Sequence, residues 1–296
     1  MPRYKALETT FVETKLHCCL TDDDKISWPS YSAATYTVGS TGTVPDLHAL
    51  FPLFQEEADT PAMIKHGMTV VKEATEFLNP GQIPILAVDQ PLFALAKYIQ
   101  WAFVDDFGSK KFVVMLGGLH TEQAVLHCLG NLLDGSGWTT ALAEADVVSA
   151  GIAQSILRGK PIVRARFTHQ VTLAVLHILQ QQAYQSANVT MDFEEWKAQQ
   201  LDRCTTFHFW DMIMQCEAKL MIFVRAHRTK DFPLYVTALE NLVSLFFILG
   251  HPNYARWCSV HIHDMYCLEE SVEKEFLSGN WVVSKTKRWF SSIPMY

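Results

Sequence analysis

The sequence lacks the short motifs that identify many enzymes. It contains no phosphate-binding loop, no nucleophile elbow and no closely spaced CxxC pair. These absences exclude the common nucleotide-binding loop, the α/β-hydrolase signature, and the usual zinc-ribbon and thioredoxin-like sites. Motifs alone therefore leave the type of reaction open.

The chain is also short of positive charge. It has 24 Lys and Arg residues against 31 Asp and Glu residues, which gives a net charge of −7. Proteins that coat nucleic acids usually carry a basic face, because neutralisation of phosphates supplies most of their non-specific affinity. A general nucleic-acid coat is therefore disfavoured, while a local basic site stays open.

Long apolar runs are missing as well. The longest, Leu242–Leu249, is far shorter than the ~20 residues that a membrane-spanning helix needs. The segment Met1–Lys15 alternates polar and apolar residues and has no apolar core of a signal peptide. We therefore expect an intracellular protein, in the nucleus or the cytoplasm, with no membrane partner.

Cysteines are few and irregularly spaced, so they predict no disulfide framework. Their number, 7, is odd. We expect reduced thiols, mostly buried as small apolar side chains, as in other intracellular proteins. The residues are Cys18, Cys19, Cys128, Cys204, Cys216, Cys258 and Cys267.

Two apolar stretches, Ile83–Val88 and Lys111–Leu116, predict short strands, and each is followed at once by a helical pattern. The helices are expected over Pro91–Trp101 and from about Thr121 to Leu133. Consecutive strands joined by one helix normally pair in parallel through a right-handed crossover. We therefore expect the two strands to be neighbours in one sheet.

Polar residues follow both strands, at the sheet edge where α/β proteins collect their chemistry. Asp89 follows the first strand, and His120 and Glu122 follow the second. These three are the candidate catalytic residues, with Asp89 and Glu122 as ligands for Mg²⁺ or Mn²⁺. The alternative is structural, since Asp is a favoured N-cap and Glu is favoured in the first turn of a helix.

Two short basic segments are candidate nucleic-acid contacts, because clustered cations can bind phosphate. The alternatives are a solvated loop between helices for the first segment and an ordinary exposed terminus for the second. The candidate residues are Arg164 and Arg166 in the first segment, and Lys285, Lys287 and Arg288 in the second.

The patterns divide the chain into an irregular N-terminal segment (1–59), an α/β core (60–138), a helical region (139–277) and a terminal strand and tail (278–296). A helix is expected to start at Thr60 and Pro61. Further helices are expected over Thr168–Tyr184, Met191–Gln200, about Trp210–His227, from Pro233 to just before Gly250, and Asn253–Glu270; short strands are expected over Ala34–Val38 and Trp281–Ser284.

Several long runs resemble an uncharacterised family of transposon-borne animal proteins, which are similar to transposases with an RNase H-like core. The resemblance extends from about Leu50 to Ile293. It is carried by FQEEADTPAMIKHGM, NPGQIPILAVDQPLFALAKYIQW, GGLHTEQAVLHCLGNLLDGSGWTTAL, HQVTLAVLHILQQQAY, MDFEEWKAQQ, HPNYARW and VVSKTKRWFSSI.

This resemblance implies a helix-dominated α/β fold: a small RNase H-like mixed sheet with a long all-helical insertion. Asp89 matches the first catalytic acid of such transposases. Gly118 occupies the place of the second acid, so Glu122 would have to substitute for it. The third acid would follow Tyr296, and the resemblance therefore implies a chain truncated at its C-terminus.

The expected function is that of a transposon-derived, transposase-like protein without DNA cleavage or strand transfer, because a two-metal site needs carboxylates on both sides of the phosphate. Weak DNA binding, and binding of Mg²⁺ or Mn²⁺, stay open. One alternative is a non-catalytic helical protein-interaction module, which the acidic charge and the aromatic helices favour. A weaker alternative is a divalent-metal-dependent hydrolase.

Overall fold

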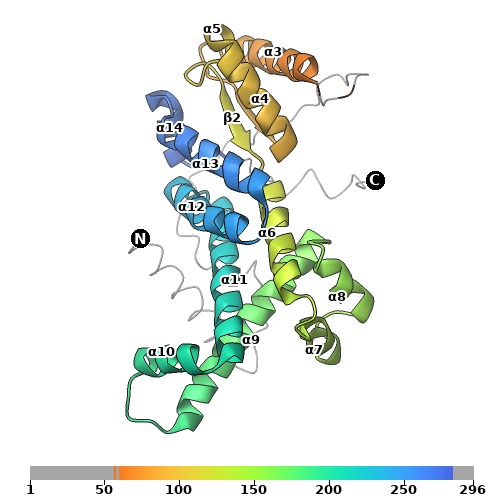
Figure 1. Ribbon diagram of the computed structural model, residues 1–296. Helices are drawn as coiled ribbons and strands as arrows, with labels where there is room; N and C mark the ends of the chain where they lie inside the picture. Colours follow the sequence, from red (N-terminus) through yellow and green to blue (C-terminus); the bar gives the residue numbers. More distant parts are fainter. Residues whose placement is uncertain (1–56, 58–59, 283–296) are drawn as a thin grey trace.

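The computed structural model describes Glu57 and residues 60–282. The predicted strand over 34–38, most of the N-terminal segment 1–59, two of the cysteines (Cys18 and Cys19) and the basic residues Lys285, Lys287 and Arg288 lie outside the described residues. Within them the fold is dominated by helices, with one small parallel sheet (Figure 1).

The sheet and its helices form one end of the molecule. In chain order the elements are α3 (Pro61–Leu78), β1 (Ile85–Val88), α4 (Gln90–Ala102), α5 (Val104–Phe107) and β2 (Val113–Leu116). The two strands pair in parallel, with Ile85 opposite Val113 and Val88 opposite Leu116. The prediction of two neighbouring strands is therefore confirmed.

The remaining elements are all helices, which confirms the predicted all-helical character of residues 139–277. They are α6 (Gly118–Leu133), α7 (Trp138–Glu144), α8 (Ala150–Ile156), α9 (Ile162–Ala187), α10 (Phe193–Arg203), α11 (Thr205–Thr229), α12 (Phe232–Ile248), α13 (Pro252–Tyr266) and α14 (Glu270–Leu277). Figure 1 shows α6 running from the sheet towards α7, α8 and α9 at the other end.

The resemblance implied a mixed RNase H-like sheet, whereas the described strands form one two-stranded parallel sheet. The coarse expectation of a helix-dominated fold with a small sheet is confirmed. The RNase H-like core itself stays a prediction.

Local signals explain several of the helix starts. The hydroxyl of Thr60 accepts a hydrogen bond from the backbone N–H of Met63, and Pro61 occupies the first position of α3. Asp192 caps α10 and Asp231 caps α12 in the same way. Where such caps stand in the sequence, the predicted starts are close to the observed ones.

Three predicted boundaries are wrong. Helix α11 begins at Thr205 rather than about Trp210, because its N-cap is Cys204, which is not a favoured capping residue. Helix α9 begins at Ile162 rather than Thr168. The prediction misses the first turns of this helix because their arginines interrupt the apolar pattern.

The helix expected over Asn253–Glu270 corresponds to α13, which ends at Tyr266, and the sequence patterns predict no helix where α14 follows from Glu270 to Leu277. The carboxylate of Glu269 accepts from the backbone N–H of Ser271 and caps α14, and glutamate is not a favoured N-cap, so the sequence hides this break.

The strand expected over residues 281–284 is not formed where the chain is described. Trp281 and Val282 lie in a turn and a bend after α14, and the other two residues lie outside the described residues. The indole of Trp281 donates to the backbone carbonyl of Lys230, at the end of α11.

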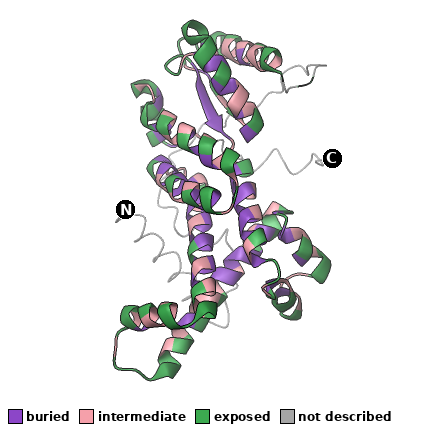
Figure 2. Ribbon diagram, in the orientation of Figure 1, coloured by how far each residue is buried: buried purple, intermediate pink, exposed green. Residues whose placement is uncertain are grey.

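The core is built around α11, which packs on α6, α9, α10 and α12. Figure 2 shows buried residues concentrated along α6, α11 and β2, while the outer faces of α3 and α10 are exposed. All residues of β2 are buried, whereas β1 alternates between exposed and half-buried residues. The largest fully buried side chains include Phe93, Phe223, Tyr235 and Phe246.

Helix α6 packs so closely on the chain after α8 that only glycine fits at position 130. A Cβ atom there would lie 1.8 Å from the backbone carbonyl oxygen of Leu157. Backbone cannot yield as a flexible side chain can, so the contact fixes the spacing between the two segments.

We predict that Gly130→Ala lowers the free energy of unfolding by at least about 2 kcal/mol, because it overpacks the interior. The matched control is Gly67→Ala in α3, where an added Cβ meets nothing within 4 Å. That change is expected to stabilise the protein by about 0.5–1 kcal/mol through helix propensity. Chemical denaturation monitored by circular dichroism distinguishes them, and equal effects of the two substitutions would contradict the packing described here.

Candidate functional site

The carboxyl ends of β1 and β2 lie together, as predicted. The backbone N–H of Gly117, after β2, donates to the carbonyl of Val88, the last residue of β1, at 2.7 Å. Asp89 directly follows β1 and is the N-cap of α4, where its Oδ1 accepts from the N–H of Leu92 at 3.2 Å. Asp89 therefore has the structural role that its residue type favours.

Glu122 is held by a two-pronged ion pair. It lies in α6, and both of its carboxylate oxygens accept from Arg166 of α9: Nε donates to Oε1 and Nη2 to Oε2, each at 2.7 Å. The exposed fractions of the two side chains are only 7% and 16%. Such paired, charge-assisted hydrogen bonds are strong and directional, so this contact fastens α9 to α6.

Arg164 and Arg166 lie in the first turns of α9, so the interpretation of this segment as a loop between helices is wrong for them. Arg164 is exposed. The guanidinium of Arg166 binds Glu122. The exposed cations of this segment are therefore Arg158, Lys160 and Arg164.

His120 is exposed in the first turn of α6, and its backbone carbonyl accepts from the hydroxyl of Tyr254 in α13 at 3.2 Å. In the part of the chain that the structure describes, no group of three or more His, Cys, Asp or Glu residues is arranged to hold a metal ion. Metal binding by Asp89 and Glu122 alone stays a prediction.

Gly118, where the resemblance places an acid, lies against a histidine ring. A Cβ atom at this position would be 2.2 Å from Nε2 of His227 in α11. Nδ1 of His227 lies 3.0 Å from the carbonyl oxygen of Phe223, and burial lowers the pKa of His227 to about 4. The ring is therefore neutral at neutral pH, and its Nδ1–H donates to Phe223. An aspartate at position 118 would have to displace this ring.

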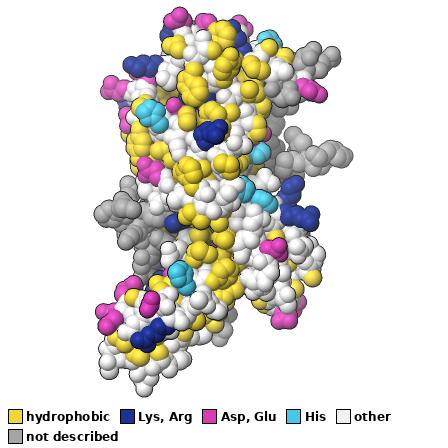
Figure 3. All heavy atoms as spheres, in the orientation of Figure 1, with side chains coloured by type: hydrophobic (Ala, Val, Ile, Leu, Met, Phe, Trp, Pro, Cys, Tyr) yellow, Lys and Arg dark blue, Asp and Glu magenta, His cyan; other side chains and the backbone are white. Residues whose placement is uncertain are grey.

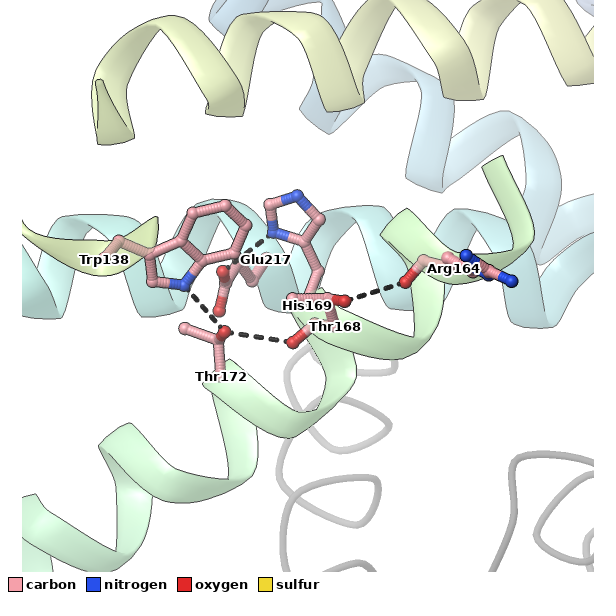
Figure 4. Close-up of polar contacts among 6 residues, drawn as sticks. All are labelled: Trp138, Arg164, Thr168, His169, Thr172 and Glu217. Carbon is pink, nitrogen blue, oxygen red and sulfur yellow. Dashed lines mark hydrogen bonds and ion pairs between the residues drawn. The ribbon is translucent and has the colours of Figure 1, made fainter. Parts of the chain in front are cut away.

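The sequence pattern missed a buried polar pair between α9 and α11. Nδ1 of His169 lies 3.0 Å from Oε1 of Glu217, and neither side chain is exposed. Trp138 of α7 stacks on the His169 ring, and its indole N–H donates to Thr172 at 2.9 Å (Figure 4). Burial lowers the pKa of His169 to about 3 and raises that of Glu217, so the pair is neutral at neutral pH.

Trp138 and Thr172 also line a large open groove between α7, α9 and α11, with a volume of about 680 Å³. Hydrophobic side chains form a band over α9 and α11 in the lower half of Figure 3. On α9, Val175 and Leu179 are 47% and 54% exposed. The apolar lining includes Trp138, Leu142, Val171, Val175, Leu176, Leu179, Phe207, Trp210 and Met214.

The groove has few polar groups, and they are held from within the protein. Oδ1 of Asp211 accepts from Gln180 at 2.9 Å and from Lys197 at 2.8 Å, and Oδ2 accepts from Gln215. A signal for this surface exists in the sequence, since residues 167–188 contain no Lys, Arg, Asp or Glu.

Five cysteines lie within the described residues, and all five are free, as predicted. Cys128, Cys216 and Cys258 are buried, whereas Cys204 and Cys267 are exposed. Burial raises the pKa of Cys128 to about 12, which keeps it a thiol rather than a nucleophilic thiolate. No helix of the described part is both long and apolar enough to cross a membrane.

Comparison with known proteins finds one family. The model of a domain of unknown function (DUF8702) matches residues 27–196 and 177–295, and thus most of the chain. No curated protein and no solved structure matches the chain.

We predict that Glu122 and Arg166 are strongly coupled. Glu122→Ala and Arg166→Ala should each cost about 3 kcal/mol of unfolding free energy, because each leaves a largely buried charge without its partner. The double variant should cost less than the sum of the two, with a coupling of at least about 1.5 kcal/mol.

The matched control for this double-mutant cycle is the exposed pair Lys72 and Asp106. Their charged atoms lie 3.7 Å apart, and their side chains are 42% and 63% exposed. Its coupling should stay below about 0.5 kcal/mol. Urea denaturation of all the variants measures both couplings, and similar values for the two pairs would show that the Glu122 contact is not a structural link.

Proposed function

The chain belongs to the DUF8702 family, and we propose that it is a non-catalytic helical protein that binds another protein through the groove between α7, α9 and α11. We further propose that it is transposon-derived and transposase-like in layout, without DNA cleavage or strand transfer. The position of Asp89 at the end of β1 supports this layout, together with the sequence runs that resemble a family of transposon-borne proteins similar to transposases.

The groove is the observation that carries the binding role. Monomeric soluble proteins rarely expose a large contiguous apolar surface unless it meets a ligand or a partner. Here Trp138, Phe207 and Trp210 line the groove together with half-exposed aliphatic residues of α9. Aromatic side chains of this kind supply much of the binding energy in protein interfaces.

The surroundings of the candidate acids support the absence of catalysis. Both oxygens of Glu122 are occupied by Arg166, and the ring of His227 fills the space beside Gly118. A metal ion that clamps a reacting phosphate needs carboxylate oxygens free to face it. The metal-dependent hydrolase, which relies on Glu122, is disfavoured for the same reason. Weak DNA binding through Arg164 stays a prediction.

We predict that the protein does not cleave or join linear, nicked or hairpin DNA in the presence of Mg²⁺ or Mn²⁺. The comparison variant is Asp89→Asn, because asparagine preserves the N-cap of α4 and removes only the carboxylate charge. Gel assays should detect no cleaved or joined DNA with either protein. Turnover in the native chain that Asp89→Asn abolishes would overturn the non-catalytic assignment.

We also predict that the groove accepts an apolar probe. Nile red, a neutral dye, should bind the protein saturably at about 1 µM, and Val175→Asp/Leu179→Asp should weaken that binding at least about tenfold by placing charge on the apolar wall. Phe247→Asp/Ile248→Asp is the matched control, since these side chains are 65% and 76% exposed on α12. Dye binding that is equal in the two variants, measured by fluorescence titration, would count against the groove as a binding surface.

A further inference from the structure

We propose that His263 and Cys267 form a binding site for Zn²⁺ or a chemically similar divalent cation at the end of α13. The two residues are four positions apart, and Sγ of Cys267 lies 3.8 Å from Nε2 of His263. Both residues are exposed, so an ion in solution can reach them. No residue of α13 lines the groove between α7, α9 and α11, and the inference therefore does not depend on the proposed binding role.

The distance between the two atoms fits a single bound ion. Zn²⁺ bonds to sulfur at about 2.3 Å and to imidazole nitrogen at about 2.0–2.1 Å, in a tetrahedral arrangement. Two ligands at these lengths, with a tetrahedral angle between them, are about 3.5 Å apart. The observed separation of 3.8 Å is only about 0.3 Å wider. A small rotation of either side chain closes this difference, since both side chains are exposed.

The residue types select the class of cation. Thiolate and imidazole are ligands that Zn²⁺ prefers, whereas Mg²⁺ and Mn²⁺ prefer oxygen ligands. The site therefore differs in chemistry from the Mg²⁺ or Mn²⁺ site that the sequence predicts at Asp89 and Glu122. When the zinc–sulfur bond forms, the thiol of Cys267 releases its proton to water, and the neutral ring of His263 supplies a lone pair. Water occupies the remaining positions around the ion.

The surroundings favour a positive charge. Both ligands lie at the C-terminal end of α13, and the carbonyl groups at that end of a helix carry partial negative charge. Glu269 and Glu270 follow within three residues of Cys267. Hydrogen bonds from Ser271 lower the pKa of Glu269, with a smaller contribution from Lys110, so this carboxylate is charged at neutral pH. A divalent cation is therefore attracted to this end of the helix.

A second pair of the same residue types provides a contrast within the chain. Cys204 and His208 are also exposed and four residues apart, but they lie at the N-terminus of α11, where the helix dipole repels cations. Cys204 is the N-cap, and its Sγ accepts from the backbone N–H of Phe207 at 3.4 Å. We therefore expect this pair to bind Zn²⁺ much more weakly than His263 and Cys267 do.

The experiment measures how fast iodoacetamide alkylates each exposed thiol of the native chain, by mass spectrometry of its peptides. Zn²⁺ at about ten times the dissociation constant should slow the alkylation of Cys267 about tenfold, because only the unbound fraction reacts. Alkylation of Cys204 in the same sample should be nearly unchanged. Mg²⁺ at the same concentration should protect neither thiol.

Two variants test whether the ion binds through both residues. His263→Gln should raise the dissociation constant for Zn²⁺ at Cys267 at least about tenfold, since even an outer partner of a metal ligand is worth about 10–100-fold. His208→Gln is the matched control and should leave the protection of Cys267 unchanged. Both histidines are exposed on helices, and circular dichroism establishes that both variants fold.

Co²⁺ adds a spectroscopic measurement. Bound in place of Zn²⁺, it should give the native chain a thiolate-to-cobalt absorption band, which Cys267→Ser removes and Cys204→Ser retains. Alkylation of Cys267 that Zn²⁺ does not slow, or protection that survives His263→Gln, would overturn the proposal. Equal protection of Cys267 and Cys204, or equal protection by Mg²⁺, would show adventitious binding only and would overturn it as well. The dye titration tests the groove separately.

Discussion

The close packing of α6 is the constraint on which the rest of the structure depends. This helix leaves β2 at Gly118, where only a hydrogen atom fits beside the ring of His227, and it passes the chain after α8 at Gly130, where only a hydrogen atom fits beside a carbonyl oxygen. Between these two contacts Glu122 binds Arg166 and holds α9. Helix α6 thereby joins the sheet at one end to the helical region at the other, and α13 adds a second connection because it packs on α4 and β2 (Figure 1).

That packing uses the groups that a catalytic site would need. Asp89 stabilises the first turn of α4, Glu122 neutralises a largely buried arginine, and the pKa of His227 is lowered so that it packs as a neutral ring. The same holds deeper in the helical region, where His169 and Glu217 form a neutral pair under Trp138 (Figure 4). Polar residues in this protein serve largely to fix helices against one another, because buried polar groups must be paired to be tolerated.

The apolar side chains at the groove between α7, α9 and α11, by contrast, have no partner among the described residues that covers them. Many apolar side chains of the helical region are buried, yet Val175 and Leu179 of α9 are about half exposed at an open groove. A helix that keeps apolar residues on its outer side and carries no charge over residues 167–188 has the composition of an interface. The proposed role follows from the contrast between these exposed apolar side chains and the polar side chains that hold the helices together.

The sequence by itself determined the two adjacent parallel strands, the capped starts of α3, α10 and α12, and the all-helical character of residues 139–277, because these depend on local periodicity, caps and short connections. The sequence also predicted that Asp89 and the residues after β2 lie at one edge of the sheet. Only the tertiary structure decided that Glu122 meets Arg166, that His227 closes the space at Gly118, and that α7, α9 and α11 leave a groove. The reason is physical: these contacts join residues far apart in the chain, and a pattern within one helix shows which face is apolar without showing what covers it.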